Sequence, residues 1–173
     1  ALNLEPYRNG IKVDTHMRTS ASNVWAAGDV TAFSLLAHTA IREGQVAVND
    51  MLGIDDEMEY NAIPGVIYSS PEVAGCGVTE DALKQEGKEY EVHKLAMTHS
   101  GRFVAENEGG NGLCKILTNK EKQIIGMHFI GNPASEMLSC ACIGISSRMT
   151  VDQIQKVVFT HPPVTEIISE TSD

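Results

Sequence analysis

The order of apolar and polar residues over positions 1–54 predicts a strand, a loop and a helix after an initial strand pair. A turn signal at Asn9-Gly10 separates two short extended runs. An apolar run at 23–30 ends in glycine and aspartate and has the length of a short buried strand. Helical spacing follows at 37–52, with Gly53 as a stop signal. One broad apolar helix face is expected from Ala40, Ile41, Gly44, Ala47, Val48 and Met51.

The end of this predicted strand is a candidate ligand site. In open α/β sheets, ligands bind beyond the carboxyl ends of strands, and helix N-termini favour electron-rich groups. Asp29 is therefore placed to bind a ligand hydroxyl, and the backbone amides around Ala37 and His38 are expected to face the same ligand. A plain turn at Gly28-Asp29, with His38 as an ordinary residue of the helix start, explains the local pattern equally well.

Beyond an acidic connector, the pattern changes to grouped strands followed by helices. A division between residues 1–54 and 55–173 is expected at this connector. This order predicts an α+β fold, with an antiparallel sheet of about four to five strands and helices on one side. Extended runs lie at 66–68, 73–76, 90–97, 112–118 and 123–130, and helices are expected at 79–87, at 134–148 and from 150 onward. Thr79 and Thr150 are the expected N-caps, with Gln153 completing a capping box.

Charge and hydropathy narrow the class of partner. The 13 basic and 23 acidic side chains give a net charge of −10, which argues against nucleic acid and anionic membranes as partners. No apolar run in the sequence approaches the length of a membrane-spanning helix, which is about 20 residues. The start of the sequence lacks the charged and apolar regions of a signal peptide. We therefore expect a cytoplasmic protein. The chain begins in mid-pattern without methionine, from which we expect a fragment of a longer protein.

The four cysteines do not form a recognisable motif. Cys76, Cys114, Cys140 and Cys142 include no CxxC pair and lack zinc-site spacing, so we expect small buried side chains and assign no metal. Residues two apart on a helix point to different faces, so a disulfide between Cys140 and Cys142 would be strained.

A histidine and a carboxylate flank a double proline near the C-terminus. Pro162 and Pro163 favour extended backbone before them, so His161 is expected to stand outside a helix that begins near Val164. Glu166 would lie in the first turn of that helix. A carboxylate bonded to one ring nitrogen fixes the tautomer and makes the other nitrogen a better base. The alternative interpretation is a surface turn before a short helix whose acidic first turn suits the helix dipole.

Three sets of residues together resemble the pyridine nucleotide-disulfide oxidoreductases, and the resemblance covers nearly the whole chain. Residues 19–29 resemble the second FAD motif of the family, which ends in Gly-Asp. Residues 64–80 resemble the start of the dimerisation domain, and their Pro-Glu-Val-Ala at 71–74 favours the lipoamide branch. His161-Pro162 with Glu166 resembles the catalytic His-Pro and glutamate.

The resemblance implies a division of roles along the chain. Residues 1–54 would be the remnant of an FAD-binding region, and residues 55–173 would be the dimerisation domain. Asp29 would bind the ribityl chain of FAD, and the backbone of Leu36, Ala37 and His38 would approach the flavin pyrimidine ring. The cofactors implied for the parent protein are FAD and NAD.

The same resemblance implies an oxidoreductase that works as a homodimer. His161 would be the acid/base of a dithiol exchange and Glu166 would orient it, at the flavin site of the other subunit. The substrate would be lipoamide or a lipoyl domain, and the enzyme would serve a 2-oxoacid dehydrogenase or glycine cleavage complex. The apolar surfaces of the last three helices would supply much of the dimer interface.

The sequence departs from the family pattern in two places, and two alternative functions remain open. Pro163 stands where the family usually has a capping threonine, which would place this proline at the first helical position. The sequence contains neither an N-terminal GxGxxG nor a paired active-site cysteine motif, so the fragment alone is expected to be inactive. The alternatives are a non-catalytic dimerisation module and the same fold in a glutathione-type disulfide reductase.

Overall fold

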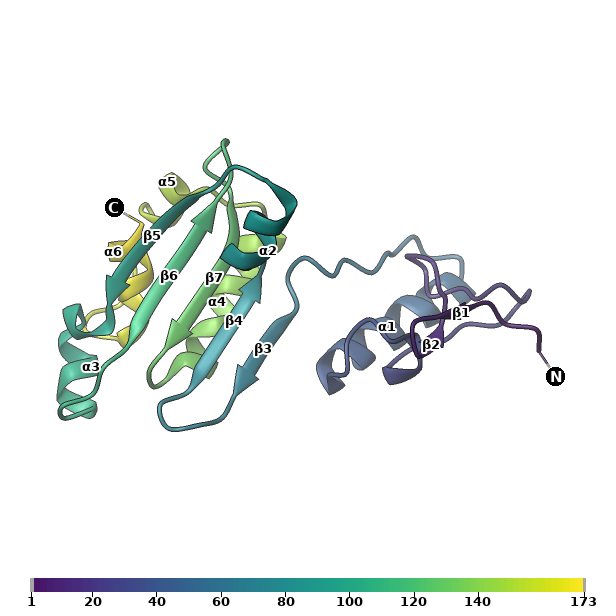
Figure 1. The fold of residues 1–173 in the computed structure, drawn as a ribbon, viewed down its shortest axis with the longest axis horizontal. Coiled ribbons are helices and arrows are strands. Elements are labelled where there is room, and N and C mark those ends of the chain that lie inside the picture. Colours follow the sequence, from purple (N-terminus) through teal and green to yellow (C-terminus); the bar gives the residue numbers. More distant parts are fainter. Residues whose placement is uncertain (1, 173) are drawn as a thin grey trace. The chain divides into compact units, whose positions relative to one another are not determined.

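A computed structural model describes residues 2–172 and divides the chain into two compact units, Ala1–Tyr60 and Asn61–Asp173. The division expected from the sequence lay between residues 54 and 55, within the connector that precedes Tyr60. Figure 1 labels the α-helices and strands of both units. Across the described residues, no helix combines the length and the apolar character that a membrane crossing requires.

The first unit contains a small hairpin, a short 3-10 helix and one long helix. The predicted strand pair is confirmed, because β1 (Pro6–Tyr7) pairs antiparallel with β2 (Gly10–Ile11), with the turn at Arg8-Asn9, one residue before the expected Asn9-Gly10. The 3-10 helix η1 (Asp29–Thr31) precedes α1 (Ala37–Met51), which confirms the helix expected at 37–52. Gly53 follows the helix with a positive φ of 73°, in keeping with its predicted role as a stop.

The strand predicted at 23–30 is wrong. Within the described chain this segment has one isolated β-bridge, between Trp25 and Arg18, and then enters η1. Asn23 and Gly28 have positive φ values of 60° and 83°, which interrupt an extended run at both ends. Apolar composition alone therefore overstated the extended structure, because a strand also needs neighbours that complete its hydrogen-bond ladder.

The predicted apolar face of α1 is buried only in part. The helix buries Thr39, Glu43, Val46 and Ala47. In contrast, the exposed fractions of Ile41, Val48 and Met51 are 64%, 52% and 52%. The helix is rotated in this way because Glu43 is the acceptor for several buried hydrogen bonds, which are described below.

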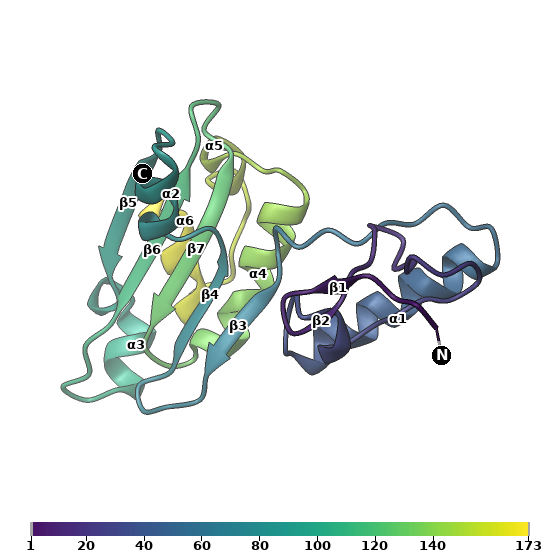
Figure 2. The same cartoon turned by 45° about the vertical axis from the view of Figure 1, so that its right-hand side comes forward.

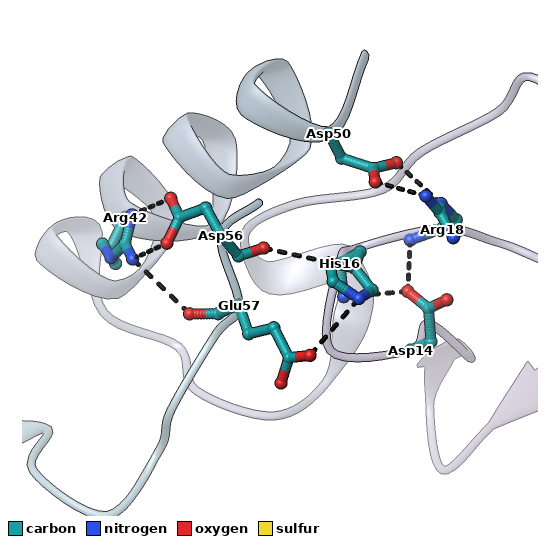
Figure 3. Close-up of polar contacts among 7 residues, drawn as sticks. All are labelled: Asp14, His16, Arg18, Arg42, Asp50, Asp56 and Glu57. Atoms are coloured by element: carbon teal, nitrogen blue, oxygen red, sulfur yellow. Dashed lines mark hydrogen bonds and ion pairs between the residues drawn. The ribbon is translucent and has the colours of Figure 1, made fainter. Parts of the chain in front are cut away.

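Charged side chains fasten the connector after α1 to the rest of the first unit (Figure 3). Arg42 of α1 donates two hydrogen bonds to the Asp56 carboxylate, at 2.7 and 2.5 Å. With Asn49, this guanidinium holds the pKa of Asp56 well below its usual range. His16 contacts the Asp56 carbonyl oxygen through Nδ1 at 3.0 Å, and its Nε2 lies 3.4 Å from Glu57 Oε1. These contacts explain why an acidic, poorly patterned connector takes a defined path.

The second unit is built on one antiparallel sheet of five strands, in the order β3-β4-β7-β6-β5. This confirms the predicted α+β class and the expected number of strands. The hairpin of β6 and β7 is confirmed as well, with Leu113 opposite Ile130 and a register shift near Leu117. The strands are β3 (Pro64–Ile67), β4 (Val73–Gly77), β5 (Glu91–Ala96), β6 (Leu113–Thr118) and β7 (Ile124–Ile130).

Two helices cover one face of this sheet and form the core with it. Figures 1 and 2 show α4 (Ala134–Ser146) and α6 (Ile167–Thr171) behind the strands. Phe129 and Met127 of β7 are fully buried beneath them. The shorter helix α5 (Val151–Ile154) begins with the predicted capping box of Thr150 and Gln153.

The opposite face carries the small helix α2 (Glu80–Glu86) in front of the sheet in Figure 1. Thr79 caps it as predicted, accepting a hydrogen bond from the Ala82 amide at 3.2 Å, and Gly87 ends it. Lys115 of β6 reaches Glu80 at 3.1 Å and helps to hold the pKa of this carboxyl at about 2. A 3-10 helix η2 (Met97–His99) and a helix α3 (Gly101–Glu106), which the sequence patterns did not predict, connect β5 to β6.

Candidate functional site

The double proline directs the chain from an exposed turn into the last helical segment. The His161–Pro162 peptide bond is cis. Pro163 is extended, with φ −84° and ψ 160°, and is the N-cap of η3 (Val164–Glu166), which continues into α6. Pro163 therefore lies one position before the first helical residue rather than at it. The expectation that His161 stands outside the helix is confirmed, and so is the placement of Glu166 in the first turn.

His161 and Glu166 are in direct contact. The ring nitrogen Nδ1 of His161 is 3.0 Å from Glu166 Oε2. The histidine side chain is 82% exposed, whereas the glutamate side chain is 16% exposed. A largely buried carboxylate that accepts from Nδ1–H leaves Nε2 as the basic nitrogen, on a ring that is mostly exposed to solvent. Such a pair can take up and return a proton.

Buried residues on the same short segment hold the glutamate in place. Val164, Ile167 and Ile168 are 5%, 0% and 0% exposed and belong to the core of the second unit. Thr171 Oγ1 donates to the Ile167 carbonyl oxygen at 2.6 Å near the end of α6. The helix packs against β5 and β6, so the dyad stands on a fixed support although its histidine is exposed.

The other predicted site residues lie in the first unit, close together in sequence. Asp29 is the first residue of η1 and is exposed. Leu36 is the N-cap of α1, with extended backbone, and Ala37 and His38 are its first two residues. All three are exposed. The structure thus places the predicted residues in two groups, with Asp29 to His38 in one unit and the dyad in the other.

A buried glutamate, which sequence reasoning missed, fixes the turn before Asp29. Glu43 is 0% exposed and accepts from the Gly28 amide at 2.5 Å and from the Tyr60 hydroxyl at 2.6 Å. Thr31 Oγ1 is 3.4 Å from Glu43 Oε1, the oxygen that also accepts from Tyr60. Burial and the Glu43 carboxyl together raise the pKa of Tyr60 far above its ordinary value. The sequence feature that could have revealed Glu43 is its spacing of four residues from Thr39 and from Ala47, which places all three on the same face of α1, the face that the helix buries.

Gly28 has a backbone conformation that suits glycine, with φ 83° and ψ −157°. A side chain added there would also meet Ala40 Cβ at 3.4 Å. The Gly28 amide is thus held by α1, and the Asp29 carboxylate is left exposed beside it. Over residues 2–172, no group of three histidine, cysteine or acidic side chains is arranged to hold a metal ion.

Comparison with known families agrees with this division of the chain. Residues 63–172 match the family described as "Pyridine nucleotide-disulphide oxidoreductase, dimerisation domain". Residues 1–48 match the family described as "Pyridine nucleotide-disulphide oxidoreductase". The first match covers more than half of the chain and includes the whole sheet and the His161–Glu166 pair.

Full-length relatives and solved structures give the same result. The chain is 37% identical to the mitochondrial dihydrolipoyl dehydrogenase of Sus scrofa and 36% identical to that of Homo sapiens, each over 172 residues and 99% of the chain. It spans about a third of these relatives, 33% of each.

A crystal structure of LpdA from Mycobacterium tuberculosis superposes with a TM-score of 0.90 at 24% identity, over 99% of this chain and 38% of that one. The flavoprotein disulfide reductase RclA from Escherichia coli superposes at 0.81 and 20% identity, over 95% of this chain and 38% of that one. The family match, the five-stranded sheet and the sequence relatives agree. The chain therefore belongs to the pyridine nucleotide-disulphide oxidoreductase family, and residues 63–172 are its dimerisation domain.

Proposed function

We propose that the chain is the C-terminal, flavin-contacting and dimerising part of an FAD-dependent dihydrolipoamide dehydrogenase that oxidises dihydrolipoamide and reduces NAD. The observation that carries the proposal is the 3.0 Å contact between His161 Nδ1 and Glu166 Oε2, with the rest of the ring exposed. The names of the sequence relatives support dihydrolipoamide as the substrate.

The role of the dyad follows from the chemistry of thiols. A thiolate, not a thiol, is the nucleophile in thiol–disulfide exchange, so dihydrolipoamide must lose a proton before it attacks. His161 takes that proton at Nε2, because Glu166 accepts from Nδ1–H and holds the ring in this tautomer. The imidazolium that forms lies beside the glutamate carboxylate, which stabilises it.

Residues of the first unit fit FAD. The Asp29 carboxylate is exposed and its backbone is fixed through the Gly28 amide, so it would hold the ribityl hydroxyls. The N-terminus of the 15-residue helix α1, at Leu36, Ala37 and His38, would face the electron-rich pyrimidine edge. When bound, FAD supplies the electron acceptor between the substrate dithiol and NAD.

We further propose that the protein works as a homodimer whose contact surface includes exposed apolar residues near the last helices. Ile143, Val157 and Val158 are 63%, 43% and 95% exposed. Apolar residues at these exposures favour a protein partner. A lipoyl domain of a 2-oxoacid dehydrogenase or glycine cleavage complex is the proposed source of the substrate.

Replacement of His161 in the intact enzyme tests the dyad. We expect His161→Gln to reduce lipoamide turnover by about 10²- to 10⁴-fold, the usual contribution of a positioned acid/base. The fold should survive, because the ring is 82% exposed. His93→Gln is a matched control, because it makes the same substitution on a different element, β5, where His93 contacts Thr118 Oγ1 at 3.4 Å and not the dyad. Unchanged turnover in His161→Gln would refute the role of the dyad.

Two measurements separate this proposal from its alternatives. An intact enzyme that reduces glutathione disulfide but does not oxidise dihydrolipoamide would belong to a glutathione-type reductase. The chain would be a non-catalytic dimerisation module if it sediments as a dimer and its parent protein lacks disulfide oxidoreductase activity. A monomer at micromolar concentration would count against the module and against the proposed contact surface.

A further inference from the structure

We propose that Cys76 and Cys142 form a reversible thiol–disulfide site that can join β4 to α4. The Cys76 and Cys142 sulfurs are in hydrogen-bond contact, 3.5 Å apart. A disulfide needs a separation of about 2.05 Å, so the sulfurs must approach by about 1.5 Å for the bond to form. The pair is distant in sequence, and for this reason cysteine spacing did not reveal it.

The two elements bring the thiols together by ordinary packing. Helix α4 contacts β4, Cys76 belongs to the buried core of the second unit, and Cys142 packs against that core. Both thiols are free. They belong to the dimerisation domain and lie on different elements from the His161–Glu166 dyad. The site therefore stands independently of the function proposed above.

The surroundings of the two sulfurs differ, and this assigns their roles. Cys76 is 1% exposed, whereas Cys142 is half-buried. The neighbouring Cys142 and burial raise the pKa of the Cys76 thiol, so Cys76 keeps its proton. Hydrogen bonding with Cys76 lowers the pKa of Cys142. Cys142 is thus the sulfur that becomes a thiolate first, and its residue is the more exposed of the two.

A small disulfide such as glutathione disulfide completes the reaction. The Cys142 thiolate attacks one sulfur of glutathione disulfide, which forms a mixed disulfide and releases one glutathione thiolate. Cys76 passes its proton to a released thiolate and attacks Cys142 Sγ, which expels the second glutathione. Two protein thiols are oxidised, one glutathione disulfide is reduced to two glutathiones, and β4 becomes covalently joined to α4.

The other two cysteines serve as internal controls. Cys114 is fully buried, and burial raises the pKa of its thiol to about 12, so it should resist both oxidation and alkylation. Cys140 precedes Cys142 by two residues on α4 and is half-buried, and burial raises its pKa. Positions two apart on a helix point to different sides, so Cys140 is not directed at Cys76.

The test equilibrates the folded chain in glutathione buffers of increasing oxidation, alkylates free thiols, digests with trypsin and measures the peptides without reduction. Trypsin leaves Cys76 in peptide 43–84 and both Cys140 and Cys142 in peptide 123–148. We expect a linked pair of these peptides that appears in a single two-electron transition and disappears with dithiothreitol. The oxidised chain should also melt at a higher temperature than the reduced chain.

Variants assign the linkage within the shared peptide. The Cys140→Ser chain should still form the linked pair. The Cys142→Ser chain should lose it, and the Cys76→Ser chain should accumulate a glutathione adduct on Cys142. Absence of the linked pair from the oxidised wild-type chain, with circular dichroism showing that it is folded, would overturn the proposal. A disulfide within peptide 123–148, between Cys140 and Cys142, would overturn it as well.

Discussion

Replacement of Glu43 by alanine should strongly destabilise the first unit. The carboxyl accepts from the Gly28 amide at 2.5 Å and from the Tyr60 hydroxyl at 2.6 Å, so its removal leaves both donors without their acceptor. An unsatisfied buried donor costs about 1–3 kcal/mol. Gly28 is buried, so the cost of its unsatisfied amide should lie in the middle of this range. Tyr60 is half-buried and its hydroxyl can reach water, so the cost there should lie at the lower end.

Two further effects modify this estimate. Each buried methylene lost from Glu43 costs about 0.8 kcal/mol. Removal of a buried carboxyl also recovers the desolvation energy that its burial requires. The expected net loss is about 3 kcal/mol, which is a large part of the stability of a small domain, about 5–15 kcal/mol. Tyr60→Phe removes one donor but leaves Glu43 bonded to Gly28, so it should cost about 1 kcal/mol.

The single tryptophan gives an assay that reports this unit alone. Trp25 is the only tryptophan in the chain, and its indole N–H donates to Asp50 at 2.7 Å. Urea unfolding followed by Trp25 fluorescence should show a midpoint about 2 M lower for Glu43→Ala, given about 1–3 kcal/mol per molar of urea for small proteins. Glu59→Ala is a matched control, because Glu59 is an exposed acid in the same unit.

Three results would bear on this reasoning. A Glu43→Ala midpoint within roughly 0.3 M of wild type, at an unchanged slope, would refute it. The double variant with Tyr60→Phe should be less destabilised than the two single variants predict together, by about 1 kcal/mol, because both changes remove the same hydrogen bond. Full additivity would show that the two side chains act separately.

Further predictions concern the second unit. Lys115 lowers the pKa of Glu80 to about 2, so the ionised carboxylate stabilises the fold at pH values above its unfolded pKa of about 4.3, and this stabilisation is lost as pH falls toward 2. In calorimetry, the stability difference between wild type and Glu80→Gln should therefore shrink between these two pH values. A difference that stays constant would contradict the ion pair. Thr150→Ala removes the capping box and should cost about 1 kcal/mol in chemical unfolding, with Thr150→Ser close to wild type; equal losses in both variants would count against the cap. Phe129→Ala should cost about 3–5 kcal/mol because Phe129 is fully buried, whereas Ile130→Ala, at 41% exposure, should cost much less; thermal denaturation that ranks them in reverse would refute this placement of the core.

Local rules predicted much of the fold. The N-caps at Thr79 and Thr150 depend on residues three positions away, and the β6–β7 hairpin depends on a short turn, so nearby sequence contained the necessary information. The strand predicted at 23–30 failed because pairing is a property of neighbouring strands. Helix α3 was missed because only Phe103 of its six residues is buried, which is too little for a periodic signal.

The orientation of α1 could not be predicted from hydropathy. A periodic count favours a face with Ile41 and Val48, yet both are more than half exposed. The helix instead turns Glu43 inward, where three hydrogen-bond donors from distant positions meet it. Buried polar networks follow hydrogen-bond geometry rather than apolar periodicity, and the partner Tyr60 lies 17 residues away.

The two halves of the candidate site differed in predictability for the same reason. His161 and Glu166 are five residues apart on one rigid turn, so spacing alone brought them together, and the structure places them 3.0 Å apart. Asp29 depends instead on Glu43, which holds the amide of the residue before it from the middle of α1. If Asp29 binds flavin hydroxyls and the dyad serves lipoamide exchange, as proposed, Glu43→Gln should weaken flavin retention in the intact enzyme more than it slows that exchange. The position of Asp29 therefore depends on the buried hydrogen bond between Glu43 and the Gly28 amide, which the spacing of residues in the sequence did not reveal.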